Sequence, residues 1–316
     1  MLDKRARRRY RLRNGVQTVL LFGGMVAVLG GLAWLLLGVV GLICVLVAGG
    51  LVLLLRPKVS AGLVLSVYGA RPLPPAVAPA LDRYVRVLAE RAGLPAVPVL
   101  YYVPSPLANA FAVGRRDDAA LAVTDGLLRR LSSRELVGVL AHEVCHVRAD
   151  DLRIMNLSDT VGRLTHGLSY LGLLLLVLAV PLMATGTATP LWAALLLIVG
   201  PTLVTLLQLA LSRAREYDAD LEAAAVTGDP EGLASALEQL ERATGRLWER
   251  VMVPRGRIPD PLLLRTHPPT ADRTRRLREL IPQGERRQLG DDRQVPIAAF
   301  RPVAHPARLR FPGIRW

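Results

Sequence analysis

The chain has 316 residues, a net charge of +14 and two cysteines. Its 52% apolar and 21% charged residues indicate long apolar blocks beside ordinary soluble stretches. Two cysteines exclude a disulfide framework and favour a reducing compartment for the soluble part. The basic residues lie beside the apolar blocks and in the C-terminal tail, with few aromatic residues among them. This placement favours anionic lipid head groups over nucleic acid as the partner.

Two long uncharged blocks predict membrane helices. One crossing needs about 20 residues, so residues 15–55 are interpreted as two helices joined by a turn near Gly38–Gly41. Residues 166–211 predict a second hairpin, because the polar segment 183–190 interrupts the block with glycine and proline. The sequence therefore predicts four transmembrane helices in two hairpins.

Basic residues lie on only one side of these hairpins. Lysine and arginine precede and follow each block, whereas both hairpin turns are uncharged. The positive-inside rule then places the N-terminus, the C-terminus and all soluble sequence in the cytoplasm. No cleavable signal peptide is predicted, because the first apolar stretch is too long for one. We expect a multi-pass protein, most simply of a bacterial inner membrane.

The soluble stretches predict helices around a small β-sheet. After a Pro-rich linker at 71–75, the pattern indicates a helix at 77–92 and a strand at 97–103. Residues 109–123 are typical of a β-hairpin with its turn at 115–118. Ser132 and Glu135 have capping-box spacing and predict the start of a helix. Residues 212–281 indicate further helices with a break at 259–269.

The helix that begins at Ser132 carries a metal-binding pattern, His142-Glu143-Val144-Cys145-His146. Positions i and i+4 lie on one face of a helix, so His142 and His146 can reach the same metal. Imidazole ligands suit zinc, and Glu143 is placed to take a proton from a water molecule. Charged residues along this helix, such as Arg134 and Asp151, predict that it lies outside the bilayer core.

A third ligand is expected from another helix. A catalytic zinc has three protein ligands and one open position, and its histidines are oriented by outer partners. Glu216 and Asp220 are i, i+4 on a predicted helix, so one carboxylate can bind the metal while the other holds a ring N–H. A solvated charged helix face would give the same pattern.

These motifs together resemble the HtpX-like membrane zinc metalloproteases of the gluzincin group, which are related to the CAAX prenyl endopeptidases. The resemblance covers about residues 75–280 and includes the two hairpins. It rests on Asn109-Ala110-Phe111, on His142-Glu143-x-x-His146 followed by Asp151, on Glu216-Tyr217-x-Ala219-Asp220, and on His267-Pro268-Pro269-Thr270-x-x-Arg273.

The resemblance implies a role for each matching position. It implies Zn²⁺ held by His142, His146 and Glu216, with Glu143 as the general base and Asp220 as the partner of a ligand histidine. His267 would stabilise the oxyanion, supported by Arg273. Substrate would bind along a strand formed by residues 109–114, including Asn109, Ala110 and Phe111, to which an extended peptide adds as a further strand.

The expected fold is mainly α with a small β-sheet, namely a cytoplasmic zincin-type domain with four transmembrane helices. The expected segments are a basic N-terminal segment (1–14), the first hairpin (15–55), the first half of the catalytic domain (56–165), the second hairpin (166–211), the second half of the catalytic domain (212–281) and a basic, Pro-rich tail (282–316).

The expected activity is cleavage of misfolded or damaged membrane proteins on the cytoplasmic side, with polypeptides and the lipid bilayer as partners. A homo-oligomer is also compatible with the sequence. Three alternatives remain: a prenyl-protein protease, which should have more membrane helices; an intramembrane-cleaving protease, whose motif should lie in an apolar span; and an inactive zinc-binding scaffold, which would not need Glu143.

Overall fold

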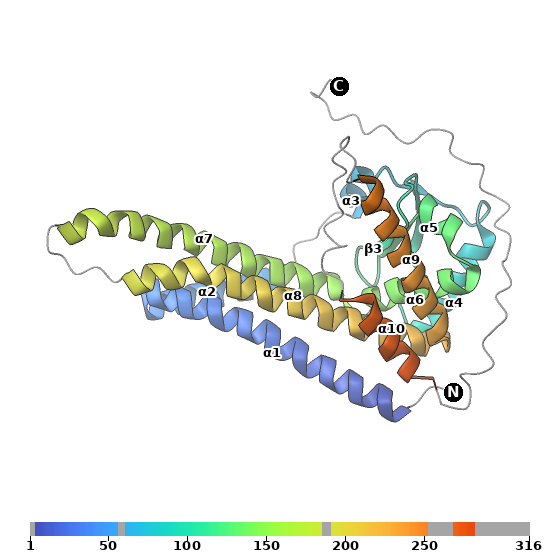
Figure 1. Ribbon diagram of the computed structural model, residues 1–316, viewed down its shortest axis with the longest axis horizontal. Helices are drawn as coiled ribbons and strands as arrows, with labels where there is room; N and C mark the ends of the chain where they lie inside the picture. The colour runs from blue at the N-terminus through green and yellow to red at the C-terminus, as the bar shows by residue number, and fades with distance from the viewer. Residues whose placement is uncertain (1–3, 56–60, 185–190, 252–267, 282–316) are drawn as a thin grey trace, which may run out of the picture. The chain divides into compact units, whose positions relative to one another are not determined.

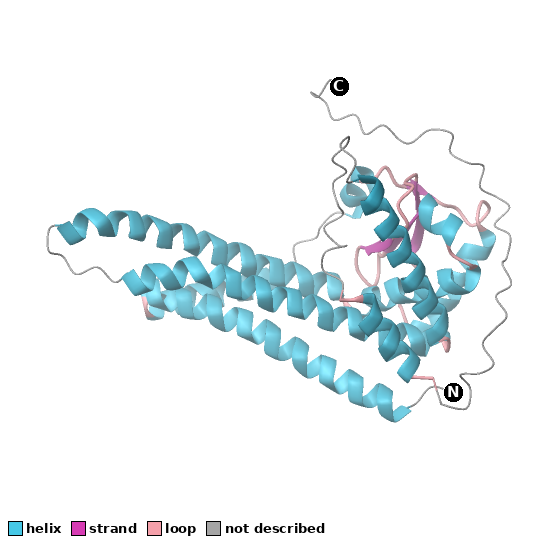
Figure 2. Cartoon of the chain, viewed as in Figure 1, coloured by secondary structure: helices cyan, strands magenta, loops and turns pink. Residues whose placement is uncertain are grey.

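The computed structural model describes residues 4–55, 61–184, 191–251 and 268–281 (Figures 1 and 2). Contacts within the chain divide it into two units, which we call the mixed unit and the helical unit. The mixed unit comprises Met1–Arg11, Val59–Leu152 and Tyr217–Trp316, and the helical unit comprises Leu12–Lys58 and Arg153–Glu216. All the strands of the described residues belong to the mixed unit.

The helical unit is built from parts of four helices. Helix α1 (Lys4–Leu37) is followed by α2 (Val39–Leu55), and the chain turns at Gly38, whose φ of 58° favours glycine. This is the turn expected near Gly38–Gly41. Helices α7 (Asp151–Ala184) and α8 (Leu191–Thr227) follow later in the chain. Most of the turn expected at 183–190 lies outside the described residues.

Three of these helices are long and apolar enough to cross a membrane, by length and composition: Arg8–Leu37, Asp151–Ala179 and Leu191–Thr227. Helix α2 has 17 residues, at the short end of the range of about 17–25 that a crossing requires. Its role as a fourth crossing therefore stays a prediction. Apolar side chains of this unit also face outward, as Trp34 and Val177 do with exposed fractions of 58% and 62%.

The mixed unit contains a four-stranded sheet with the order β1-β2-β4-β3. Strands β2 (Val99–Val103) and β4 (Ala120–Thr124) are parallel, whereas β3 (Ala110–Val113) is antiparallel to β4 and forms an edge. The expected hairpin is therefore present. Some of the expected linker is also a strand, because β1 (Arg71–Pro72) pairs with β2. Proline is tolerated there because β1 is the other edge.

The two faces of the sheet contribute to separate cores. Leu121 and Val123 of β4 point into the larger core, with residues of α4 (Pro79–Ala92), α6 (Ser133–Ala149) and α9 (Pro230–Val251). The alternate residues Ala120 and Ala122 point into a smaller core with Leu65 of α3 (Ala61–Val67). Strand β4 is buried along its whole length because both of its faces are covered.

Helix α6 begins with the predicted capping box. The Ser132 side chain accepts the backbone N–H of Glu135, and the Glu135 carboxylate accepts the backbone N–H of Ser132. Glu135 is 2% exposed and also accepts from Ser235 (2.5 Å) and Gln239 (2.6 Å) of α9. These bonds fix α6 against α9 at the end of α6 that lies before the histidines.

Two shorter helices complete the mixed unit. Helix α5 (Asp125–Arg130) follows β4 directly and is capped by Thr124. Helix α10 (Thr270–Glu279) packs on α9 and buries Arg273, Thr274 and Leu277. Residues 252–267, which hold most of the predicted break at 259–269, lie outside the described residues.

Candidate metal centre

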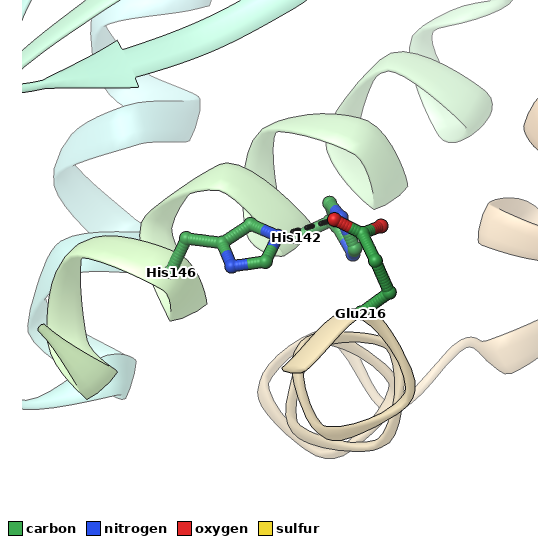
Figure 3. A group of neighbouring side chains, drawn as sticks. All are labelled: His142, His146 and Glu216. Atoms are coloured by element: carbon green, nitrogen blue, oxygen red, sulfur yellow. Dashed lines mark hydrogen bonds between the residues drawn. The ribbon is translucent and has the colours of Figure 1, made fainter. Parts of the chain in front are cut away.

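The two motif histidines converge on one point. His142 and His146 project from adjacent turns of α6, and their Nε2 atoms are 3.0 Å apart, as the dashed line in Figure 3 marks. The carboxylate of Glu216, from α8, faces the same point (Figure 3). One ligand atom from each of the three residues lies within 4.8 Å of the others. Glu216 is the last residue of the helical unit, and the unbroken α8 joins it to Tyr217 of the mixed unit.

This donor set fits a zinc ion. Two ligand atoms at about 2.05 Å from a tetrahedral zinc lie about 3.3 Å from each other, close to the 3.0 Å between the Nε2 atoms. Two imidazoles and one carboxylate are also the ligand types of a catalytic site that keeps a position open. The residues present therefore suit the metal that the motif predicts.

Each histidine has a carboxylate beside its other ring nitrogen. His146 Nδ1 is 2.7 Å from Asp151 Oδ2, and His142 Nδ1 is 3.0 Å from Asp220 Oδ1. A carboxylate accepts the Nδ1–H proton, which leaves Nε2 as the nitrogen that can bind a metal. Both rings are thus oriented so that their ligand atoms face each other.

Asp220 is fixed in turn by Arg273 of α10. The guanidinium donates to both carboxylate oxygens, at 2.7 Å and 2.6 Å. Asp220 and Arg273 are 4% and 5% exposed, so the pair is buried. A buried bidentate ion pair holds its members in one geometry, which orients Asp220 toward His142.

Sequence reasoning predicted the contact of Asp220 but gave Asp151 no role beyond structure. Asp151 is close to His146 because α6 ends at Ala149 and the C-cap residue Asp150, with a φ of 58°, turns the chain. The next residue, Asp151, then starts α7 with its carboxylate directed back at His146. The only available signal was the position of an aspartate five residues after the second histidine.

Glu143 lies between the histidine pair and the edge strand β3. Its Oε2 accepts the backbone N–H of Ala112 at 3.2 Å. In the register of β3 with β4, the pairs Phe111–Ala122 and Val113–Ala120 exchange ladder hydrogen bonds, so the backbone groups of Ala110 and Ala112 point away from β4. The carboxylate of Glu143 therefore faces the open edge of the sheet.

The three predicted substrate-binding residues have different surroundings. Asn109 is held by its backbone, whose N–H donates to Thr124 Oγ1 and whose carbonyl accepts from Thr124 N. Ala110 is half-buried at the open edge, whereas the Phe111 side chain is buried in the smaller core, 4.9 Å from the Tyr68 ring. Ala112, which sequence reasoning did not select, shares the edge with Ala110.

Two further residues of the sequence motifs are His267 and Cys145. His267 lies outside the described residues, although Arg273 of the same motif is described. Cys145, which lies inside the histidine motif, is 1% exposed within the larger core. Burial raises the pKa of its thiol to about 12, so the thiol stays protonated and is a poor metal ligand at neutral pH.

Comparison with known proteins places these features in one family. The model of "Peptidase family M48" matches residues 75–281. A protease HtpX homolog of Acaryochloris marina is 37% identical, over 86% of this chain and 94% of its own length. Another, from Kineococcus radiotolerans, is also 37% identical, over 86% and 98%.

Among solved structures, the crystal structure of S. mikatae Ste24p covers 84% of this chain and 64% of its own, with 19% identity and a TM-score of 0.42. The chain thus spans about two thirds of that protein. Since the family match takes in the histidine helix, the edge strand and α10, and since HtpX relatives align over most of the chain, this protein belongs to peptidase family M48 and is an HtpX-like membrane metalloprotease.

Proposed function

We propose that the protein is a zinc endopeptidase that cuts extended polypeptide segments at the open edge of β3. His142, His146 and Glu216 would hold the zinc. The bound ion would supply Lewis-acid polarisation of a water molecule and of the scissile carbonyl. The observation that carries the proposal is the position of Glu143. This residue follows His142 directly in the sequence, and its carboxylate accepts the backbone N–H of Ala112 on the edge strand.

The residues of this chain define the geometry of the reaction. A substrate strand would pair with the outward backbone groups of Ala110 and Ala112, and this pairing would bring a peptide bond beside Glu143. Glu143 would take a proton from the attacking water and deliver it to the leaving amine. Asp220 and Asp151 would keep both imidazoles in the orientation that leaves Nε2 free to ligate. His267 is proposed as the oxyanion donor on the family pattern alone.

The substitution Glu143→Gln tests this assignment. We expect it to lower the rate of casein cleavage about 10²–10⁴-fold, the usual contribution of a general base, while the purified protein retains about one zinc per chain. Cleavage by peptide-fragment analysis and metal content by mass spectrometry are the measurements. The control is Glu90→Gln, at an exposed site on α4. Undiminished cleavage by Glu143→Gln would remove Glu143 from the mechanism.

We also propose that the mixed unit faces the cytoplasm of a bacterial cell, from the inner membrane. Support comes from the basic residues that flank both apolar blocks and from their absence at the hairpin turns. A C-terminal fusion to a reporter that is fluorescent only in the cytoplasm should be bright. A fusion to an enzyme active only outside the inner membrane should be inactive, and the opposite pair of results would reverse the topology.

The natural substrates are proposed to be misfolded or damaged membrane proteins. An edge strand binds backbone, so it suits segments that have lost their own structure. Cells that produce Glu143→Gln in place of the wild type should degrade an unstable reporter membrane protein more slowly in a pulse-chase experiment. A stable version of the reporter serves as the control, and equal half-lives of the unstable reporter in the two strains would argue against this role.

A further inference from the structure

The first turns of α1 belong to the mixed unit. Residues up to Arg11 are grouped with this unit by their contacts, whereas the rest of α1 belongs to the helical unit. Tyr10 is 9% exposed and is a member of the larger core. Its hydroxyl donates to the Glu279 carboxylate at the end of α10, and Arg11 lies 3.4 Å from the buried carboxylate of Glu222. A segment that the sequence indicates only as a basic flank is thus packed into the unit that carries the metal centre.

Helix α10 is held at this position by aromatic contacts as well. The guanidinium of Arg276 lies 3.6 Å from the centre of the Tyr217 ring and 5.9 Å from that of the Tyr10 ring. Arg276 and Glu279 are one helical turn apart, so both contacts of Tyr10 fall on one side of α10. Figure 1 shows the start of α1 beside α10, which is drawn in red-orange.

The first turn of the same helix reaches the metal centre. Arg273, one turn before Arg276, is buried and makes the bidentate pair with Asp220. Asp220 contacts His142 Nδ1 at 3.0 Å. Contacts therefore run without a gap from Tyr10 through α10 to Arg273, and from there through Asp220 to a candidate zinc ligand.

We propose that Tyr10 is a positioning residue for the metal centre, which it serves by fixing α10 and with it the Arg273–Asp220 pair. Helix α10 has only ten residues, and a helix this short is not stable without tertiary packing. Its place therefore depends on side-chain contacts such as those of Tyr10. The proposal rests on the proposed zinc site and adds the N-terminal segment to the regions of the chain that shape it.

Two substitutions at Tyr10 separate the contributions of ring and hydroxyl. Tyr10→Ala removes both, and we expect zinc affinity to fall about 10-fold and kcat/KM for casein to fall at least as much, as for loss of an outer partner of a metal ligand. Tyr10→Phe keeps the ring in the core and beside Arg276, so it should restore most of both values. Zinc affinity is measured by competition with a chelating dye, at a temperature well below the unfolding transition of each variant.

Matched controls distinguish an effect of Tyr10 on the position of α10 from a general loss of stability or from a change of orientation in the membrane. Leu12→Ala changes a neighbouring α1 residue that is 70% exposed, and it should match the wild type. All basic residues are kept in these variants, so the charge signal for orientation is unchanged. If Tyr10→Ala fails to fold, Glu279→Gln tests the same contact from α10. It should weaken zinc binding about 3-fold, and this loss should not add to that of Tyr10→Phe, because the neutral amide weakens the same hydrogen bond that Tyr10→Phe removes.

The zinc affinities test the role of Tyr10 separately from the proposed protease activity. If the wild type binds zinc but does not cleave casein, the proposed function fails while the zinc affinities still test Tyr10. If Tyr10→Ala, or Glu279→Gln where Tyr10→Ala does not fold, binds zinc as tightly as the wild type, the positioning role is wrong. Equal losses in Leu12→Ala and Tyr10→Ala would also overturn it.

Discussion

The mixed unit buries several charged side chains within its core, whereas the buried charged residues of the helical unit, among those described, are Arg215 and Glu216 at its last two positions. In the mixed unit, Asp220, Arg273, Glu222 and Glu135 are all at most 5% exposed and each has a charged or hydrogen-bonding partner. The packed centre of the helical unit is instead made of Met25, Leu29, Val161, Val204 and Leu211. Apolar side chains can pack in several orientations with little change in stability, but the ligands of a metal centre must be held at fixed angles. Directional contacts therefore gather where chemistry requires them.

The largest expected effect comes from breaking the buried ion pair of the mixed unit. Asp220→Ala would leave Arg273 buried without its bidentate partner, which costs about 3–5 kcal/mol of unfolding free energy. Zinc affinity should fall about 10–100-fold, because His142 loses the carboxylate that orients it. Chemical unfolding in detergent and competition with a chelator measure the two effects. Asp82→Ala, which removes an exposed i, i+4 pair with Arg86, should change stability by at most about 0.5 kcal/mol; a similar small value for Asp220→Ala would contradict the comparison.

Glycine-to-alanine substitutions test whether the helices of the two units are packed equally closely, although the two units differ in buried charge. At Gly138 of α6, a Cβ would lie 2.9 Å from the Cα of Leu233 on α9, and at Gly172 of α7 it would lie 2.5 Å from the Cβ of Leu197 on α8. We expect each substitution to destabilise its unit by about 1–3 kcal/mol, since neither helix pair can separate freely.

Gly167→Ala is the matched control for these two glycines, because nothing lies within 4 Å of its added methyl group. It should change stability by less than about 1 kcal/mol, in the stabilising direction if at all. Thermal unfolding measures all three variants. If Gly172→Ala changed stability as little as Gly167→Ala while Gly138→Ala was strongly destabilising, the helices of the helical unit would be shown to accommodate an added methyl group more easily than those of the mixed unit.

The smallest expected effect concerns a partly exposed ion pair and depends on pH. Asp229 caps α9 through Gly232 N–H and pairs with Arg134 at 2.5 Å. Burial opposes ionisation of Asp229, but the hydrogen bonds from Arg134 and from the backbone N–H of Gly232, together with the charge of Arg134, outweigh it and hold the pKa below its ordinary value. A lowered folded-state pKa stabilises the fold above the unfolded-state pKa of about 3.9, and this contribution is lost as the pH falls through the folded-state pKa.

Asp229→Ala should therefore cost about 1 kcal/mol at pH 7. The difference from the wild type should shrink as the pH falls below about 4. Urea unfolding at pH 7 and at the lowest pH where both proteins are folded measures this change. A difference that stayed constant with pH would mean that the charge of Asp229 contributes nothing.

The features that sequence predicted well are those set by near neighbours along the chain. The capping box of Ser132 and Glu135 and the i, i+4 histidines are local patterns, and the hairpin of β3 and β4 has a local turn that begins after Gly114, whose φ is 93°. The histidine pair could be predicted because helical periodicity alone brings His142 and His146 onto one face of α6.

The features that sequence missed depend on distant regions of the chain. Tyr10 and Glu279 are 269 positions apart, and no periodicity in either segment connects them. The pairing of β1 with β2 adds a strand where proline indicated a linker, because an edge position removes the need for a proline N–H. Sequence also does not decide whether α2 crosses a membrane, since its length lies at the margin of what a bilayer requires.

The open edge of β3 has a consequence for which proteins would be cut. Main-chain pairing is available to almost any sequence, so an edge of this kind discriminates by conformation more than by side chain. A folded protein has its own chain in helices or paired strands, and it can offer an extended segment only when it opens locally. When opening and closing are faster than cleavage, the cleavage rate follows the population of the open form, and about 1.4 kcal/mol of local stability changes that rate 10-fold. Stability itself would then decide which chains survive.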